Sequence, residues 1–401
     1  MRRILCPEWL LDGTAAAPRQ GQAVVIAEGR IEAVSPAAEV VPRDGDEVVR
    51  APGETLLPGL INMHLHLSLA SDNAPFVPYM DAHSDVALAL RAAHNAGVAL
   101  RSGVTTVRDC GARRTTVLEL RELQAHASNP PQGARILSCG WPLTITGGHM
   151  RPFGGEVDGD LDARRMVRRL VSAGADFIKV AGSGGGTPGS LSDYPSFWPD
   201  ELRSIVDTAH GLGRKVTVHC TATAAIANVL AAGADSIEHG YFSAPGSLLA
   251  FDDRLADGLA AADIPITPTL QIARDMVETL PAGAERDAWS RRREAQAEMV
   301  QRLHRAGVRL LVGSDAGWRF TRFDTLWREM DELVGCGLSS VEAIQAATGA
   351  ASLAIGCADA FGAVRPGLSA DLLLVDGEAA RDVRCLANVR AVYVHGQPVL
   401  R

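Results

Sequence analysis

Two histidines, His64 and His66, stand one residue apart at the end of the apolar run LLPGLINMHLHLSLA, which covers residues 56–70. Side chains on a β-strand alternate between its two faces, so residues i and i+2 point the same way. Both imidazoles therefore project from one face, where they could hold one metal ion. Two ordinary loop histidines are the alternative, because a His-x-His pair is short and common. The rest of the chain decides between these two interpretations.

Residues of metal-binding type also end several of the later apolar runs. Lys179 lies in FIKVA, His219 in KVTVHC, His239 in SIEHG and Asp315 in LLVGSDA. A single histidine at the end of a strand is more often a hydrogen-bonded structural residue, and GSDA alone could be a turn. Lys179 is different, because a lysine in an apolar strand is costly unless it is paired or chemically changed. Structural explanations fit each of these residues singly, but they fit all six together poorly.

The six side chains suggest a site for two divalent metal ions. The ions of two-metal sites lie about 3.5–4 Å apart and need a bridging ligand. A lysine amine cannot bridge them, but a lysine whose nitrogen has been carbamylated by CO2 carries a carboxylate that can. Burial of a lysine favours the unprotonated amine that reacts in this way. Zinc is the metal that the ligand types favour, with manganese or cobalt as alternatives.

The elements that must position these residues alternate along the middle of the chain. Stretches of helical period separate eight short apolar runs, which are GLINMHLH, VTTVRDC, RILSCG, DFIKVA, KVTVHC, SIEHG, PITPTL and LLVGSDA. Helices are expected at 85–101, 162–173, 200–212, 222–232 and 284–306. Several of them close with glycine before the next run, which is the connection expected in a parallel sheet. Eight such units predict an α/β fold with a (β/α)8 TIM barrel over 58–358, whose catalytic residues would lie at the carboxyl ends of its strands. An open, doubly wound sheet is the alternative.

Both ends of the chain have β character instead. AVVIAEGRIEAV, at 23–34, holds two apolar runs separated by Glu-Gly, which is a hairpin signature. DLLLVDG and VRAVYVHGQPVL near the C-terminus are similar runs with glycine turns. Neither end can bury a core alone. We therefore expect residues 1–57 and 359–401 to form one small β-sandwich domain.

The composition is that of an ordinary globular chain. Of 401 residues, 47% are hydrophobic and 21% are charged, and the net charge of −8 offers no broad basic surface to nucleic acid. Seven cysteines without a CxxC pair argue against a disulfide framework and against a thiolate zinc site. No signal peptide or membrane span is expected, since Pro7 and Glu8 interrupt the first apolar run. We expect a cytoplasmic homo-oligomer with a small-molecule substrate and no contact with nucleic acid or membrane.

The ordered pattern PGLINMHLH, FIKVAGSGGG, VTVHC, SIEHG and GSDAG resembles the amidohydrolase superfamily. More narrowly, it resembles the prolidase-like and imidazolonepropionase-related branch with a binuclear metal site. The resemblance covers nearly the whole chain, both β ends included. The metal ligands that it implies are, for the first ion, His64, His66 and Asp315, for the second ion, His219 and His239, and, as the carbamylated bridge, Lys179.

The resemblance also implies catalytic roles. A hydroxide between the two metals would attack the scissile carbonyl, because bound metals lower the pKa of water, and the second metal would polarise that carbonyl. Asp315 would accept the proton of the hydroxide and pass it to the leaving amine. His149, in the glycine-rich loop TITGGHMRPFGGEVDG, matches a histidine that touches the substrate carbonyl in prolidase-like members. A loop histidine without a role is the alternative.

Further substrate contacts are predicted from single residues. Tyr241, in EHGYF, could donate a hydrogen bond to the oxyanion or could simply pack in the core. One of Arg151, Arg319 and Arg322, which follow the third and eighth runs, could pair with a substrate carboxylate, with Arg319 favoured among the three; simple solvation is the alternative. The loop GSGGGTPGS after Lys179 is interpreted as a substrate contact rather than a phosphate site, because no helix begins directly after it.

The resulting prediction is a binuclear metal-dependent hydrolase of an amide bond, in a dipeptide, Xaa-Pro included, or in an N-acyl amino acid. A mononuclear deaminase or cyclic-amide hydrolase is one alternative, but such members of the related branch lack the lysine of the fourth strand. A second alternative keeps both metals and attacks a lactone, carbamate or organophosphate, since the same hydroxide serves them all. A non-catalytic scaffold would have lost ligands, and none of the six is missing.

Overall fold

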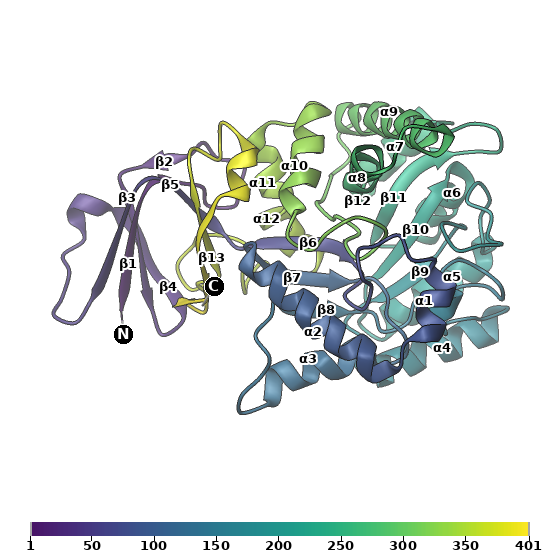
Figure 1. Ribbon diagram of the computed structural model, residues 1–401, viewed down its shortest axis with the longest axis horizontal. Helices are drawn as coiled ribbons and strands as arrows, with labels where there is room; N and C mark the ends of the chain where they lie inside the picture. The colour runs from purple at the N-terminus through teal and green to yellow at the C-terminus, as the bar shows by residue number, and fades with distance from the viewer. Residues whose placement is uncertain (1, 400–401) are drawn as a thin grey trace. The chain divides into compact units, whose positions relative to one another are not determined.

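The apolar runs form strands and the periodic stretches form helices in the computed structural model, which describes residues 2–399 (Figure 1). The strands are β1 (Arg3–Leu10), β2 (Arg19–Gln20), β3 (Gln22–Ala27), β4 (Arg30–Pro36), β5 (Glu47–Pro58), β6 (Leu60–Leu65), β7 (Val104–Asp109), β8 (Arg135–Ser138), β9 (Ile178–Ala181), β10 (Val216–Ala222), β11 (Ser236–Ser243), β12 (Ile266–Thr267), β13 (Leu372–Asp376), β14 (Val389–Val394) and β15 (Gln397–Pro398). The α-helices are α1 (Phe76–Ala82), α2 (Asp85–Arg101), α3 (Thr116–His126), α4 (Asp160–Ser172), α5 (Pro199–Gly211), α6 (Thr223–Ala232), α7 (Asp253–Ala261), α8 (Gln271–Thr279), α9 (Ala284–Arg305), α10 (Leu326–Gly335), α11 (Ser340–Ala346) and α12 (Gly349–Ala354). Short 3-10 helices cover Ala37–Glu39, Arg151–Phe153 and Val383–Ala387.

The chain divides into two units, and the first holds Met1–Asn62, Gly97–Thr106 and Asp324–Arg401. Its eight-stranded sheet has the order β15-β14-β13-β5-β1-β3-β4, with β2 beside β1. Strands from the two chain ends are neighbours, because β13 pairs antiparallel with β5. The two ends therefore join in one sheet. That this sheet belongs to a β-sandwich, with domain boundaries at 57/58 and 358/359, stays a prediction.

The predicted hairpin in the first unit is confirmed. β3 and β4 pair antiparallel, and the two turn residues between them, Glu28 and Gly29, both have positive φ, 51° and 77°. Two left-handed residues give the turn whose twist matches the twist of the flanking strands. The hairpin contributes Val24, Ile26 and Ile31 to the buried core of the unit, each at most 3% exposed.

The second unit, Met63–Ala96 with Val107–Phe323, carries the alternation of strands and helices. Strands β9 to β12 form a parallel sheet in the order β12-β11-β10-β9. A three-stranded sheet has the order β6-β7-β8. Helices α4, α5 and α6 pack side by side, and α6 packs against β10 and β11 (Figure 1). The predicted α/β class with parallel strands is confirmed.

The eighth predicted strand has a looser form than expected. Residues 310–316 are joined to β12 by one bridge at Leu310 and to β6 by one bridge at Ala316, and no continuous ladder forms. Backbone hydrogen bonds still reach both neighbours, from Leu311 to Ile266 at 2.9 Å and from Asp315 to His64 at 2.7 Å. A third single bridge links Leu143 to β9. These bridges fit a barrel, whose closure stays a prediction.

The predicted helices are found within two residues of their expected ends, and 85–101 is matched as α2. Local signals explain this agreement. At the start of α5, the Glu201 carboxylate accepts a hydrogen bond from the Trp198 N–H at 2.9 Å, and Pro199 occupies the first helical position. Gly233 ends α6 in the left-handed conformation, at φ 74°, and so directs the chain into β11. Over residues 2–399, no helix is both long and apolar enough to cross a membrane.

The glycine at position 13 is predicted to be indispensable for packing in the first unit. Its φ is +85°, and a Cβ there would lie 2.5 Å from the Gly362 carbonyl oxygen. Gly13→Ala should therefore destabilise the protein by about 2 kcal/mol or more, since left-handed backbone costs about 1–2 kcal/mol and a backbone oxygen cannot swing away. Gly45→Ala is the matched control, because Gly45 has φ +90° with no atom within 4 Å of the added Cβ. Thermal unfolding of both variants checks the prediction, and equal shifts in Tm would contradict it.

Candidate metal centre

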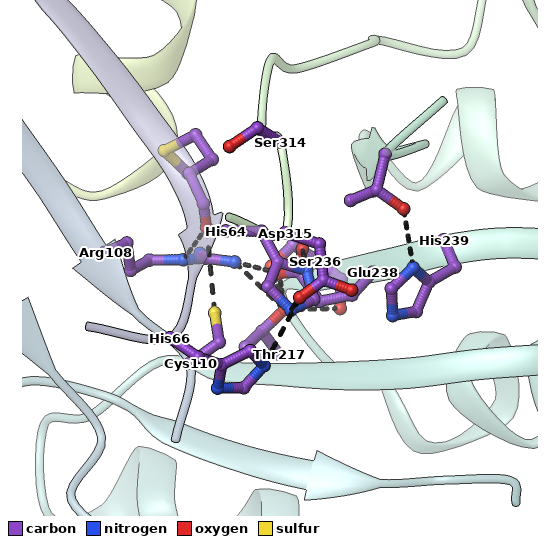
Figure 2. Close-up of polar contacts among 12 residues, drawn as sticks. His64, His66, Arg108, Cys110, Thr217, Ser236, Glu238, His239, Ser314 and Asp315 are labelled. Atoms are coloured by element: carbon purple, nitrogen blue, oxygen red, sulfur yellow. Dashed lines mark hydrogen bonds and ion pairs between the residues drawn. The ribbon is translucent and has the colours of Figure 1, made fainter. Parts of the chain in front are cut away.

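The predicted metal ligands converge within the second unit from β6, β9, β10, β11 and the segment after β12. The histidine rings form a chain, with centroid distances of 5.5 Å for His64 and His66, 5.0 Å for His64 and His239, and 4.5 Å for His219 and His239. Asp315 joins them, because its Oδ1 lies 3.5 Å from His64 Nε2 and 3.4 Å from His66 Nε2 (Figure 2). Ligand atoms of His64, His239 and Asp315 all lie within 4.8 Å of one another. This spacing suits the binding of a cation between them.

Outer hydrogen bonds decide which ring nitrogens face the centre. His66 Nδ1 lies 3.0 Å from the Gly111 carbonyl oxygen, which can only accept, so Nδ1 donates its proton and Nε2 presents a lone pair. His219 Nε2 donates to the Gly184 carbonyl at 3.0 Å, which leaves Nδ1 as the lone-pair nitrogen. His239 Nδ1 lies 2.7 Å from the Thr269 hydroxyl. Metal-binding histidines are typically fixed in this way through their second nitrogen.

Burial keeps the four imidazoles neutral. Burial, with the charge of Lys179, lowers the pKa of His64 to about 3, and burial lowers the pKa of His66 to about 4. Burial also holds the pKa of His219 and of His239 well below the ordinary value. Neutral imidazole is the form that coordinates a metal ion.

Lys179 is the least conventional member of the cluster. Its side chain is fully buried in β9, and no group among residues 2–399 makes a hydrogen bond to Nζ. Its charge acts on the same cluster: it adds to burial in lowering the pKa of His64 and of His239, and it opposes the burial that raises the pKa of Asp315 to about 7. A buried amine without a partner is costly. The donor set of this site fits divalent metal ions, and the orphaned amine fits a position between them.

Two buried charges that the sequence does not predict support the centre. Glu238 Oε2 lies 2.9 Å from His64 Nδ1, while its other oxygen accepts hydrogen bonds from Arg108 and from Thr217 Oγ1 (Figure 2). Burial opposes ionisation, but the charge of Arg108 prevails and the pKa of Glu238 is lowered. The anion therefore fixes the His64 ring so that Nε2 faces Asp315. A signal was present, because Glu238 directly precedes His239 within an apolar strand.

Cys110 lies close to this support but is not a suitable ligand. Its sulfur and atoms of His64 and Glu238 lie within 4.8 Å of one another. Burial raises the pKa of the Cys110 thiol to about 12, so the thiol stays protonated, whereas metals bind the thiolate. Glu238 is already engaged by Arg108. We therefore assign Cys110 to the packing around the centre.

A cavity of about 250 Å³ opens beside the predicted ligands and is lined by His149 and Tyr241. The Met150 N–H donates to Thr187 Oγ1 at 3.0 Å, and this hydroxyl lies 2.9 Å from His149 Nδ1. The hydroxyl hydrogen can thus go to Nδ1, which places a proton on His149 Nε2. The Tyr241 hydroxyl lies 3.1 Å from Thr269 Oγ1. Both side chains lie where their predicted contacts with substrate require, and those roles stay predictions.

The glycine-rich loop after β9 lets side chains approach the cavity closely. A Cβ on Gly185 would lie 2.7 Å from the His149 ring, and one on Gly186 would lie 2.5 Å from the Trp318 ring. Both glycines line the cavity. Because these two glycines have no side chains, His149 and Trp318 can pack against the loop and line the cavity.

The predicted arginines are placed differently from one another. Arg319 lines the cavity, and its Nη2 lies 2.8 Å from Glu285 Oε1. Arg151 donates to the Pro188 carbonyl at 2.8 Å and is not among the lining residues. Arg322 is not among them either. Their roles in substrate binding stay predictions.

Comparison with known proteins identifies the family. The family model described as the amidohydrolase family matches residues 55–399, so the chain belongs to that family and is a hydrolase. Ochratoxinase from Aspergillus niger is 26% identical over 415 residues, which cover 94% of this chain and 81% of that protein. Imidazolonepropionase from Rhizorhabdus wittichii is 27% identical over 398 residues, with 88% of each chain covered. The structure also matches the crystal structure of a Xaa-Pro dipeptidase, with 100% of both chains covered, 25% identity and a TM-score of 0.88. The prolidase-like and imidazolonepropionase-related resemblance is thereby confirmed.

Replacing the buried carboxylate at position 238 should weaken metal binding. Glu238→Gln keeps the shape but removes the anion that fixes His64, and the loss of such an outer partner typically costs about 10–100-fold in metal affinity. Competition with a chromophoric chelator measures that affinity. Glu298→Gln, on the exposed face of α9, is the control and should bind metal like the unaltered protein. Unchanged affinity in Glu238→Gln would show that His64 does not depend on this contact.

Proposed function

We propose that this protein is a hydrolase with two divalent metal ions that cleaves an amide bond in a dipeptide, Xaa-Pro included, or in an N-acyl amino acid. The observation that carries the proposal is the gathering of four neutral imidazoles, one carboxylate and an unpartnered buried lysine beside one cavity. The Xaa-Pro dipeptidase among the similar structures supports a dipeptide as substrate. Cytoplasmic location and assembly as a homo-oligomer stay predictions from the sequence.

The proposed ligands follow the sequence prediction, in a (β/α)8 barrel. Six side chains would hold the two ions. These are His64, His66 and Asp315 for the first ion, His219 and His239 for the second, and Lys179, as a carbamate, for both. Zinc suits this mixture of imidazole and carboxylate ligands. A carbamate at Lys179 would replace a buried cation by an anion able to bind a metal ion, which would remove the cost of the unpartnered amine.

Residues of the chain then transfer the proton and bind the substrate. When bound, the two ions make a water molecule more acidic and polarise a carbonyl group. Asp315 accepts a proton from the attacking water and returns it to the leaving nitrogen as the C–N bond breaks, which yields a carboxylic acid and an amine. His149 Nε2 and the Tyr241 hydroxyl donate hydrogen bonds to the substrate carbonyl oxygen as it gains negative charge.

A cyclic-amide hydrolase with one metal ion is the second candidate, and the imidazolonepropionase among the relatives favours it. Lys179 distinguishes the two candidates. A single metal ion held by His64, His66 and Asp315 needs no bridging carbamate, so the amine of Lys179 would stay buried without a partner. The orphaned Nζ therefore supports the binuclear site over the mononuclear one.

Lys179→Ala tests the bridging role directly. The variant should bind one equivalent of zinc or less and lose most of its activity, because the bridge between the ions is gone. Elemental analysis after equilibration with zinc gives the metal content, and a hydrolysis assay gives the activity. Full activity with two equivalents of metal retained would remove the carbamate from the proposal.

Asp315→Asn tests the proton transfer. The amide can still approach a metal ion but cannot accept the proton, so kcat should fall by at least about 100-fold while KM changes little. Steady-state kinetics with zinc-loaded enzyme separates the two constants. A change confined to KM would remove the proposed role of Asp315 in proton transfer.

The substrate class is tested by the release of free amino acids from a library of dipeptides and N-acyl amino acids, with zinc-loaded enzyme. Release from at least one subset of the library is expected. No release from protein that is shown to hold two metal ions would reject dipeptides and N-acyl amino acids as the substrate class. Lactones, carbamates and phosphotriesters would then be the next substrates to assay, because they suit the same nucleophile.

A further inference from the structure

The cavity beside the predicted metal ligands is lined by two arginines outside the ligand set, Arg292 and Arg319, and these differ in their partners. Arg319 forms an ion pair with Glu285, with 2.8 Å between Nη2 and Oε1. Arg292 has no carboxylate at ion-pair distance among residues 2–399, and its contact is with the Trp289 ring, 5.1 Å from the guanidinium carbon to the centroid. Arg292 therefore brings to the cavity a positive charge that no carboxylate compensates.

Arg319 is also shared with a second hollow. This hollow is lined by Arg319 and by its partner Glu285, whereas Arg292 lines the first cavity and not this second hollow. The charge of Arg319 is thus compensated by Glu285 between the cavity and the second hollow. We therefore expect an anionic group in the first cavity to bind Arg292 rather than Arg319, which is already paired.

Arg292 is held in place by packing. It lies three residues after Trp289 on α9, so the two side chains share one face of the helix. Trp289 and Trp318 pack against a buried cluster formed by Ile272, Met276 and Leu280. The indole ring thus has a firm support, and the guanidinium that lies over it is positioned at the cavity wall.

The rest of the wall is aromatic. The Phe76 ring packs edge to face against Phe153, with centroids 5.1 Å apart, and against Trp318, with centroids 5.4 Å apart. All three rings line the cavity. A substrate group between them displaces water, and in water-poor surroundings a charge-assisted hydrogen bond to an arginine is strengthened.

We propose that Arg292 binds a carboxylate of the substrate and that the cavity thereby selects acidic N-acyl amino acids or peptides over neutral amides. This inference rests on the proposed function, because it names a second recognised group beside the scissile amide. The carboxylate belongs to the leaving amino acid, as its α-carboxylate or as an acidic side chain, and both present the same planar anion to the guanidinium.

Binding to the zinc-loaded protein tests the inference without turnover. The probes are the ketomethylene analogues of N-acetyl-L-phenylalanine and of its primary amide, in which CH2 replaces the scissile amide N–H. They differ in one charge, and calorimetry gives both values of Kd. The unaltered protein should bind the acid about 10–100-fold more tightly than the amide, as expected for charge-assisted hydrogen bonds. Arg292→Gln should bring this ratio close to one, and Arg292→Lys should restore part of it.

Arg291→Gln is the matched control, because Arg291 is the exposed neighbour of Arg292 on α9 and does not line the cavity. It should keep the full ratio. The ketomethylene analogue of N-acetyl-L-glutamic acid α-amide, which carries its only carboxylate on the side chain, identifies the source of the bound anion. The acid whose affinity falls in Arg292→Gln carries the carboxylate that this residue binds.

Two results would overturn the inference. One is equal binding of acid and amide by the unaltered protein, and the other is an acid preference that survives in Arg292→Gln, as expected for a carboxylate held by the metal ions alone. An assay of amide hydrolysis with the same protein preparations tests the proposed function separately. An active hydrolase without acid preference removes this inference alone. An acid preference that is lost in Arg292→Gln, in protein that hydrolyses no amide, keeps the carboxylate site and removes the proposed function.

Discussion

Burial of Lys179 among four neutral imidazoles is the constraint on which the rest of the site depends. Its amine lies in a fully buried strand without a hydrogen-bond partner among residues 2–399. Burial keeps the imidazoles of this cluster uncharged and raises the pKa of Asp315 to about 7, while the ionised Glu238 is already engaged by Arg108. The amine therefore has no hydrogen-bonded anion of its own, and the proposed carbamate and metal ions would remove the cost of burying it.

Hydrogen bonds around the cluster hold the histidines proposed as ligands in a single orientation. The Gly111 and Gly184 carbonyls each accept a ring proton from a histidine, and Glu238 occupies the far nitrogen of His64. Arg108 ties the network to the neighbouring strand, because its Nε donates to the Met63 carbonyl at 2.8 Å. Ligands fixed in this way need little reorganisation when a metal ion binds, which favours affinity and a defined geometry.

The gathering of the six proposed ligands could be predicted because their positions depend on one regularity, the placement of polar residues at the carboxyl ends of strands. The bounds of α2 could be predicted for a similar reason, since its signals lie within the segment itself. The role of Glu238 could not, because it requires β6, β7 and β11 to lie together around one buried charge. A carboxylate in an apolar strand signals a partner but does not identify it.

Substrate contacts were harder to predict for a related reason. Arg319 is neutralised by Glu285, which lies 34 residues earlier in the chain, and no local pattern links the two. Arg292 lies in a helix that the sequence predicts well, but its approach to the cavity depends on how Trp289 packs against α8. Side chains on helices and loops are placed by such distant packing, so the sequence indicates their presence and not their partners.

The most direct test of the central claim is X-ray diffraction from crystals of the zinc-loaded protein, recorded at the zinc absorption edge. The proposed site predicts two anomalous peaks about 3.5–4 Å apart among the six side chains. It also predicts electron density for a carboxylate group that extends from Lys179 Nζ and lies between the two peaks. A single peak beside an unmodified Lys179 would contradict the binuclear centre and with it the proposed function.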